Sequence, residues 1–130
     1  MGAVKIDYDK VEWKPFLTPP GRGGGGTINP GLRYKPVKVG ELGFSKFAWT
    51  AGGTEDWHSH DVEPQIVMCL SGKIEFGVKD GDVPRKEMLL PGDVLAIPPG
   101  VPHMATAVED TILVVMWAPM RRFSADAIIV

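Results

Sequence analysis

Two histidines separated by one residue, His58 and His60, are the clearest candidates for chemistry in this chain of 130 residues. Side chains alternate between the faces of a strand, so two imidazoles two residues apart in an extended segment can converge on one point. Gln65 opens an apolar run five residues later, and its amide oxygen can add a hard ligand beside the softer nitrogens. The third and last histidine, His103, lies in a second segment rich in glycine and proline. The pattern predicts a metal ion held by three imidazoles and a fourth group.

The identity of that fourth group is open on these residues alone. A single buried histidine is usually held by a hydrogen bond and ligates nothing, whereas three histidines with this spacing favour ligation. Gln65 can coordinate a metal or only hydrogen-bond a neighbouring loop. Glu63 is the competing carboxylate, but Pro64 interrupts the strand pattern, so the face on which Glu63 lies cannot be predicted. Cys69 shares a face with Gln65 and is predicted to line the cavity or the core, because no fourth histidine is present to activate it as a nucleophile.

The two segments resemble the two sequence motifs of the cupin family. The first motif is matched, with gaps of five, one, four and six residues, by Gly52, His58, His60, Gln65 and Gly72. The second is matched, with gaps of five, one and two residues, by Gly92, Pro98, Gly100 and His103. The family usually has Glu where this chain has Gln65 and Asn where it has Ala107. Two spaced patterns in the right order make the resemblance specific.

The resemblance implies an all-β fold, the double-stranded β-helix or jelly-roll barrel of cupins. It also implies one divalent transition metal ion per chain, which can be Fe, Ni, Mn or Zn. The metal ligands that it assigns are His58, His60, Gln65 and His103.

An amide in place of a carboxylate changes the expected charge of the centre. Three neutral imidazoles and Gln65 would leave the full double positive charge on the ion, which favours a small anionic, oxygenated substrate. Four protein ligands on an octahedral ion leave two adjacent positions for that substrate. We therefore expect a metal-dependent enzyme that acts by Lewis-acid catalysis in an isomerisation, a ring opening or a cyclisation. A non-haem dioxygenase is the alternative, and a cupin that binds a small molecule without turnover is a further one.

A narrower resemblance concerns the end of the barrel. The ligand set is similar to that of the small cupins of pectin and alginate breakdown, which linearise unsaturated monouronates, and of cupin-type polyketide cyclases. In the first group the last strand carries an acid, an aromatic residue, a proline and an arginine, at positions that correspond here to Val115, Trp117, Pro119 and Arg121. Valine cannot transfer a proton, so this chain departs from that group at its acid. Trp117 and Arg121 remain catalytic candidates, as a ring that stacks on substrate and a clamp for its carboxylate, although barrel filling and a surface charge are the simpler interpretations.

Composition limits the other classes of function. With 44% hydrophobic residues the chain is predicted to form one domain, 1–130. A net charge of −2 with mixed signs provides no basic stripe for nucleic acid and no polybasic patch for a membrane. The single cysteine cannot form an intrachain disulfide, and the N-terminus lacks the apolar core of a signal peptide, so a cytoplasmic location is expected.

Turn residues divide the chain into three parts. Residues 1–32 are predicted to be an N-terminal arm with a Gly-rich loop at 21–26, since no strand precedes and no helix follows that dinucleotide-like glycine pattern. Short strands separated by turn signals are predicted over 33–119, at 43–50, 65–70, 73–78, 88–90, 94–98, 103–108 and 111–117. Residues 120–130 form a tail whose apolar end should dock on the barrel or a partner. The run 65–70 is apolar on both faces, which predicts a homodimer that covers the outer one.

Overall fold

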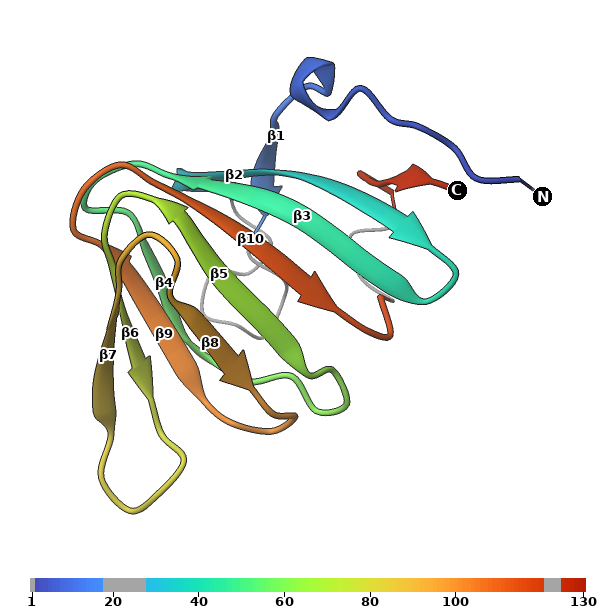
Figure 1. The fold of residues 1–130 in the computed structure, drawn as a ribbon. Coiled ribbons are helices and arrows are strands. Elements are labelled where there is room, and N and C mark those ends of the chain that lie inside the picture. The colour runs from blue at the N-terminus through green and yellow to red at the C-terminus, as the bar shows by residue number, and fades with distance from the viewer. Residues whose placement is uncertain (1, 18–27, 121–124) are drawn as a thin grey trace.

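The computed structural model describes residues 2–17, 28–120 and 125–130, and almost all of its regular structure is β-strand (Figure 1). The elements in chain order are the 3-10 turn η1 (Tyr8–Lys10) and the strands β1 (Lys14–Leu17), β2 (Ile28–Val39), β3 (Leu42–Trp49), β4 (Thr54–His58), β5 (Gln65–Ser71), β6 (Ile74–Val78), β7 (Arg85–Leu89), β8 (Val94–Ile97), β9 (His103–Ala107), β10 (Thr111–Trp117) and β11 (Ile128–Ile129).

These strands form two facing sheets. The larger sheet has the order β1-β2-β3-β10-β5-β8, with β11 added beside β2, and the smaller has the order β4-β9-β6-β7. All of the pairs are antiparallel except β11 with β2. Such a pair of sheets with crossing connections is the double-stranded β-helix of cupins, so the predicted fold class is confirmed.

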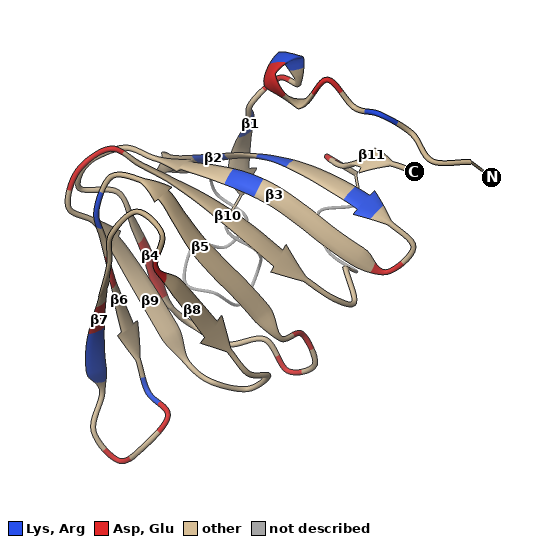
Figure 2. Ribbon diagram, in the orientation of Figure 1, with Lys and Arg blue, Asp and Glu red and all other residues tan. Residues whose placement is uncertain are grey.

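The alternation of side chains along the strands makes the core. In β6, β9 and β10 every second residue is buried, because one face of each strand points between the sheets. Fully buried side chains from both sheets meet there, and the largest include Tyr34, Leu32, Ile74 and Leu113. The charged residues lie in turns and loops and on some of the strands, whereas β5, β8, β9 and β10 carry none (Figure 2). No helix in the described part of the chain is long and apolar enough to cross a membrane.

Part of the expected N-terminal arm belongs to the larger sheet. Lys14–Leu17 pairs with β2, and Phe16 is only 3% exposed within the core. The strand that was expected from residue 33 begins at Ile28. These residues form strands because of contacts between distant segments. The ring of Phe16 packs against the rings of Tyr34 on β2 and Phe47 on β3. The Gly-rich loop at 21–26 lies outside the described residues.

The C-terminal end docks as its apolar character predicts. Ile128 and Ile129 pair in parallel with Val37 and Lys38 of β2, and the Val130 N–H donates to the Lys38 carbonyl over 2.9 Å. This end of the chain therefore covers the free edge of β2 next to the N-terminal segment (Figure 1).

Candidate metal centre

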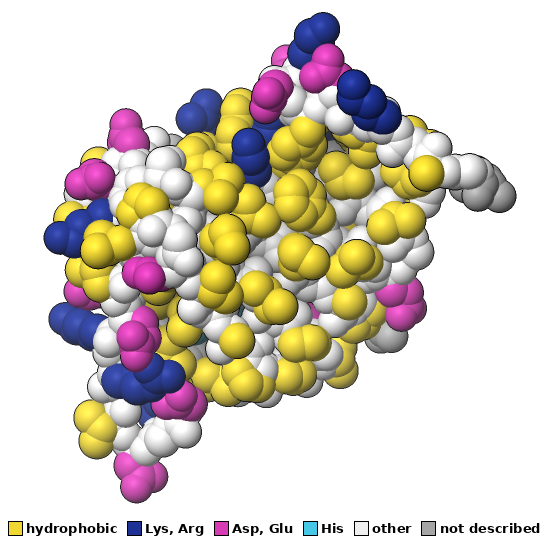
Figure 3. Space-filling view, in the orientation of Figure 1, with side chains coloured by type: hydrophobic (Ala, Val, Ile, Leu, Met, Phe, Trp, Pro, Cys, Tyr) yellow, Lys and Arg dark blue, Asp and Glu magenta, His cyan; other side chains and the backbone are white. Residues whose placement is uncertain are grey.

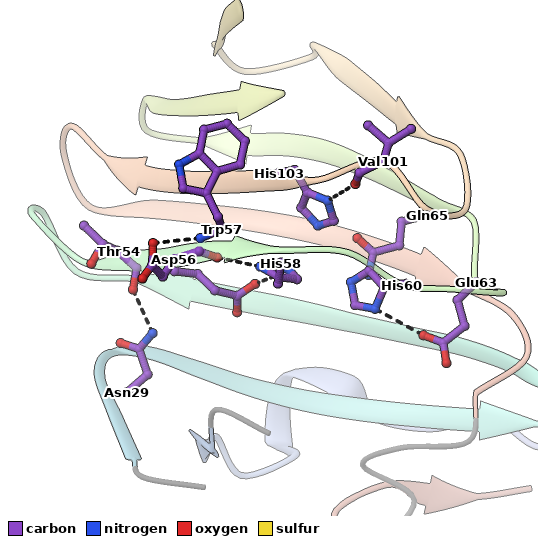
Figure 4. A network of polar contacts seen from close by, with 11 residues as sticks. Asn29, Thr54, Asp56, Trp57, His58, His60, Glu63, Gln65, Val101 and His103 are labelled. Atoms are coloured by element: carbon purple, nitrogen blue, oxygen red, sulfur yellow. Dashed lines mark hydrogen bonds and ion pairs between the residues drawn. The ribbon is translucent and has the colours of Figure 1, made fainter. Parts of the chain in front are cut away.

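Two strand ends and the turn after one of them bring the histidines together inside the barrel. His58 ends β4 and lies directly opposite His103, the first residue of β9, while His60 lies in the turn after β4. The carbonyl of His60 accepts a hydrogen bond of 2.7 Å from the Gly100 N–H, which ties the first motif to the second. Ring nitrogens of the three histidines lie within 4.8 Å of one another, so the predicted convergence is present (Figure 4).

Each imidazole is oriented by a contact between its Nδ1 and a nearby oxygen atom. The His58 Nδ1 lies 2.7 Å from the Asp56 carbonyl, and the His103 Nδ1 lies 2.9 Å from the Val101 carbonyl. The His60 Nδ1 lies 3.4 Å from a carboxylate oxygen of Glu63 (Figure 4). A carbonyl only accepts, so Nδ1 carries the hydrogen in His58 and His103, which in a neutral ring leaves the lone pair on Nε2. This is the arrangement that second-shell oxygens impose on metal-binding histidines.

The two candidates for the fourth group lie on opposite sides of His60. Glu63, which is 7% exposed, contacts Nδ1, the side away from a shared ion. The side-chain amide of Gln65 lies 3.1 Å from Nε2, the side where an ion would sit. Rotating that amide by half a turn exchanges its nitrogen for its oxygen at this place. The geometry thus favours Gln65 over Glu63 as a neighbour of the ion.

A carboxylate that sequence reasoning missed also faces the centre. Glu55 lies on β4, and its Oε1 is 2.8 Å from the His58 Nε2. An odd separation of three residues would place Glu55 and His58 on opposite faces of a regular strand. The β4–β9 register shifts between them, however, and this irregularity could not be read from the sequence.

The cavity beside the histidines has a volume of about 60 Å³, enough for a few water molecules or a small part of a substrate. Its polar end is formed by the three histidines, Gln65, Glu55 and Glu63, and the rest is apolar. Trp117 pairs with Gln65 across β10 and β5 and is 5% exposed, and Val115 also lines the wall. Among the described residues of this lining, none is Lys or Arg. Arg121 lies outside the described residues.

Cys69 belongs to the core, in agreement with the sequence interpretation. Its side chain is fully buried and does not line the cavity. Burial, with the negative charge of Asp93 as the next cause, raises the pKa of the Cys69 thiol above its ordinary value. A thiol of raised pKa carries little thiolate, so Cys69 is unsuited to act as a nucleophile.

The donor set fits a divalent transition metal. Three imidazoles oriented through Nδ1, with an amide and a carboxylate at their Nε2 side, offer the mixed nitrogen and oxygen ligands that Fe, Ni, Mn and Zn accept. The side chains of His58, His60 and His103 are nearly inaccessible to solvent, which favours a defined site over adventitious surface binding.

Known structures resemble this fold over most of its length. KdgF from Halomonas sp. is 22% identical, with a TM-score of 0.72 over 94% of this chain and 97% of the other. A sugar phosphate isomerase of the cupin superfamily from Silicibacter pomeroyi is 18% identical, with a TM-score of 0.71 over 88% and 75%. An oxalate oxidase in complex with glycolate is 20% identical, with a TM-score of 0.62 over 72% and 53%. At these identities the likeness establishes the fold alone.

Sequence comparison gives the family. No curated protein matches this chain significantly. The model of the cupin domain matches residues 46–119, more than half of the chain and the whole of the segment that holds the three histidines. The chain therefore belongs to the cupin family.

Proposed function

We propose that this cupin is a metal-dependent enzyme that converts a small oxygenated substrate by Lewis-acid catalysis. The observation that carries the proposal is the group of three histidines at the polar end of an otherwise apolar cavity. The Nδ1 of each of these histidines contacts an oxygen atom. When bound there, a divalent transition metal would polarise a substrate carbonyl or a water molecule. The proposed ligands are His58, His60, His103 and Gln65.

The protein's own residues would hold the substrate and exclude water. The apolar walls, which include Val115 and, next to Gln65, Trp117, leave space for a substrate only a few atoms across at the centre. The flat face of Trp117 is suited to contact a ring or a planar enol. Arg121 stays a prediction as the residue that binds a substrate carboxylate.

Two carboxylates beside the histidines bear on the expected attraction for an anionic substrate. Glu55 and Glu63 are carboxylates with side chains 16% and 8% exposed, each in contact with one of the histidines. Their two negative charges offset the double positive charge that an amide ligand would otherwise leave on the ion. An anionic substrate would then be retained by coordination more than by net attraction.

Val115 favours a second candidate, a dioxygenase. This residue occupies the position where the uronate-linearising cupins have an acid, and it is buried in the apolar wall. A reaction with oxygen at the metal does not need a proton donor at that place. The two candidates therefore differ in whether oxygen is consumed.

Turnover under two atmospheres separates these functions. The metal-loaded protein is offered small keto acids, hydroxy acids and unsaturated uronates, and products are followed by NMR with and without oxygen. We expect conversion at the same rate in both atmospheres. Conversion that stops without oxygen identifies a dioxygenase, and binding without conversion of any tested compound identifies a binding protein.

We also propose a homodimer that covers the outer face of β5. Ile66, Met68 and Leu70 are 51%, 38% and 41% exposed there. Met116 and Val94 lie beside Ile66 and Met68 on the neighbouring strands, so the apolar surface is continuous (Figure 3). Exposed apolar surface of this kind marks an interaction site.

The oligomeric state tests this surface. We expect light scattering at micromolar concentration to give twice the chain mass of 14.1 kDa, and Ile66→Asp to give monomers because a charge would be buried at the contact. Val83→Asp is the matched control, since Val83 is 76% exposed in the β6–β7 hairpin, away from this surface. A monodisperse monomer for the parent protein contradicts the proposal.

A further inference from the structure

The irregularity in β4 turns Glu55 toward the metal centre. Glu55 pairs with Ala105 and His58 pairs with His103, so β4 has two residues between these pairs where β9 has one. One extra residue on one strand is a β-bulge. Because of this bulge, Glu55 and His58 lie on the same face of β4 although they are three residues apart. Glu55, His58, His103 and Ala105 all line the cavity, as this register requires.

Both ring nitrogens of His58 face oxygen atoms that accept hydrogen bonds. Nδ1 lies 2.7 Å from the Asp56 carbonyl, and Nε2 lies 2.8 Å from the Glu55 carboxylate. A neutral imidazole has one hydrogen, and the carbonyl requires it on Nδ1. The contact between Nε2 and the carboxylate is therefore held either by a second proton on the ring or by a metal ion between the two atoms, and the group of three histidines favours the metal ion.

The separation of these two atoms suits neighbouring ligands of one ion. Nitrogen and oxygen ligands lie about 2.1 Å from a transition metal, so two of them at a right angle are about 3.0 Å apart. The Glu55 and His58 atoms are 2.8 Å apart, and the Gln65 and His60 atoms are 3.1 Å apart. Glu55 and Gln65 thus each stand beside a different histidine at the spacing of adjacent ligands.

We infer that Glu55 is a metal ligand and supplies the carboxylate that cupins usually place at the position of Gln65. In this chain the negative ligand would come from β4, and the amide of Gln65 would take the place of the usual acid. The inference rests on the proposed metal-dependent function. It predicts a centre with three imidazoles, one carboxylate and one amide, which leaves one position of an octahedron for substrate.

Moving the carboxylate tests the assignment. Zn²⁺ affinity of the metal-free protein is measured by competition with a chromophoric chelator, and the visible spectrum of the Co²⁺ form reports the ligands. We expect Glu55→Gln to weaken Zn²⁺ binding at least about 100-fold, beyond the roughly 10–100-fold of a residue that only orients a ligand. The Co²⁺ spectrum should change as well. Adding Gln65→Glu to Glu55→Gln should restore most of the affinity, because the carboxylate returns to the centre from the other side.

Glu41→Gln is the control, because Glu41 is exposed in the turn between β2 and β3. If Glu55 only accepts a hydrogen bond from His58, its carboxylate competes with the metal for Nε2, and Glu55→Gln would bind Zn²⁺ as tightly as the parent or more tightly. That result overturns the assignment. Should Glu55→Gln fail to fold, Glu55→Asp, which shortens the side chain by one methylene, is expected to weaken binding too. A parent protein that binds no Zn²⁺ or Co²⁺ would instead refute the proposed function.

Discussion

His103→Ala is expected to lose nearly all of the bound metal. His103 is 3% exposed, and its ring centre lies 4.2 Å from that of His58 and 5.4 Å from that of His60. Removing one of three imidazoles leaves a site without its third nitrogen, and no other histidine exists in the chain to replace it. We expect metal content by elemental analysis to fall below about a tenth of the parent value. Protons compete for the same nitrogens, so acid should release metal from the parent as well.

Two controls separate ligand loss from damage to the fold. Cys69→Ala removes the only thiol, another possible donor for a transition metal, from a buried place outside the cavity, and it should keep full metal content. Free imidazole should partly restore metal binding to His103→Ala, because the substitution leaves a space of the same shape. Full occupancy in His103→Ala would remove His103 from the centre.

Gly72→Ala is expected to destabilise the fold by at least about 3 kcal/mol. Gly72 has φ of +88°, where a side chain is strained, and a Cβ there would lie 2.2 Å from the Asp110 carbonyl oxygen and 2.5 Å from the Thr111 Oγ1. The backbone of Asp110 and the buried Thr111 cannot move away without losing their packing against the β5–β6 turn, the corner in which Gly72 lies. The free energy of unfolding, measured in urea, checks this expectation.

Two other glycines divide that cost into its parts. Gly92 has φ of +94° but nothing within 4 Å of a Cβ, so Gly92→Ala should cost only about 1 kcal/mol from the backbone. Gly81 has neither a positive φ nor a close neighbour, and Gly81→Ala should change stability by less than about 0.5 kcal/mol. A loss for Gly72→Ala no larger than that for Gly92→Ala would show that the close approach to Asp110 does not constrain the corner.

Local pattern in the sequence predicted the short strands and the pair of His58 and His60, whereas the cupin fold followed from the family resemblance. Glycines at turns, alternation within short strands and the single residue between His58 and His60 are all readable from the chain. The convergence of His103 with the other two followed from the resemblance of both motifs to those of cupins, and the structure confirms that the rings meet.

What the sequence did not predict depends on pairing between distant segments. Glu55 was missed because one extra residue in β4, visible only against β9, reverses the face on which it lies. Lys14–Leu17 falls within the predicted N-terminal arm because four residues with a proline have no strand pattern of their own, and only pairing with β2 makes them a strand. The sequence leaves the choice between Gln65 and Glu63 open because Pro64 interrupts the alternation of side chains along the strand. In the structure, Gln65 lies at the Nε2 of His60 and Glu63 lies at its Nδ1.

The most direct test of a metal centre at these histidines is an anomalous difference map, recorded at the absorption edge of the copurified metal. The protein is purified without a metal-affinity column, and the metal is first identified by elemental analysis. We predict one peak per chain, about 2.0–2.2 Å from the Nε2 atoms of His58, His60 and His103. A fully ordered cavity with no peak at these nitrogens after growth in excess divalent metal, or a peak held only by residues elsewhere, would contradict it.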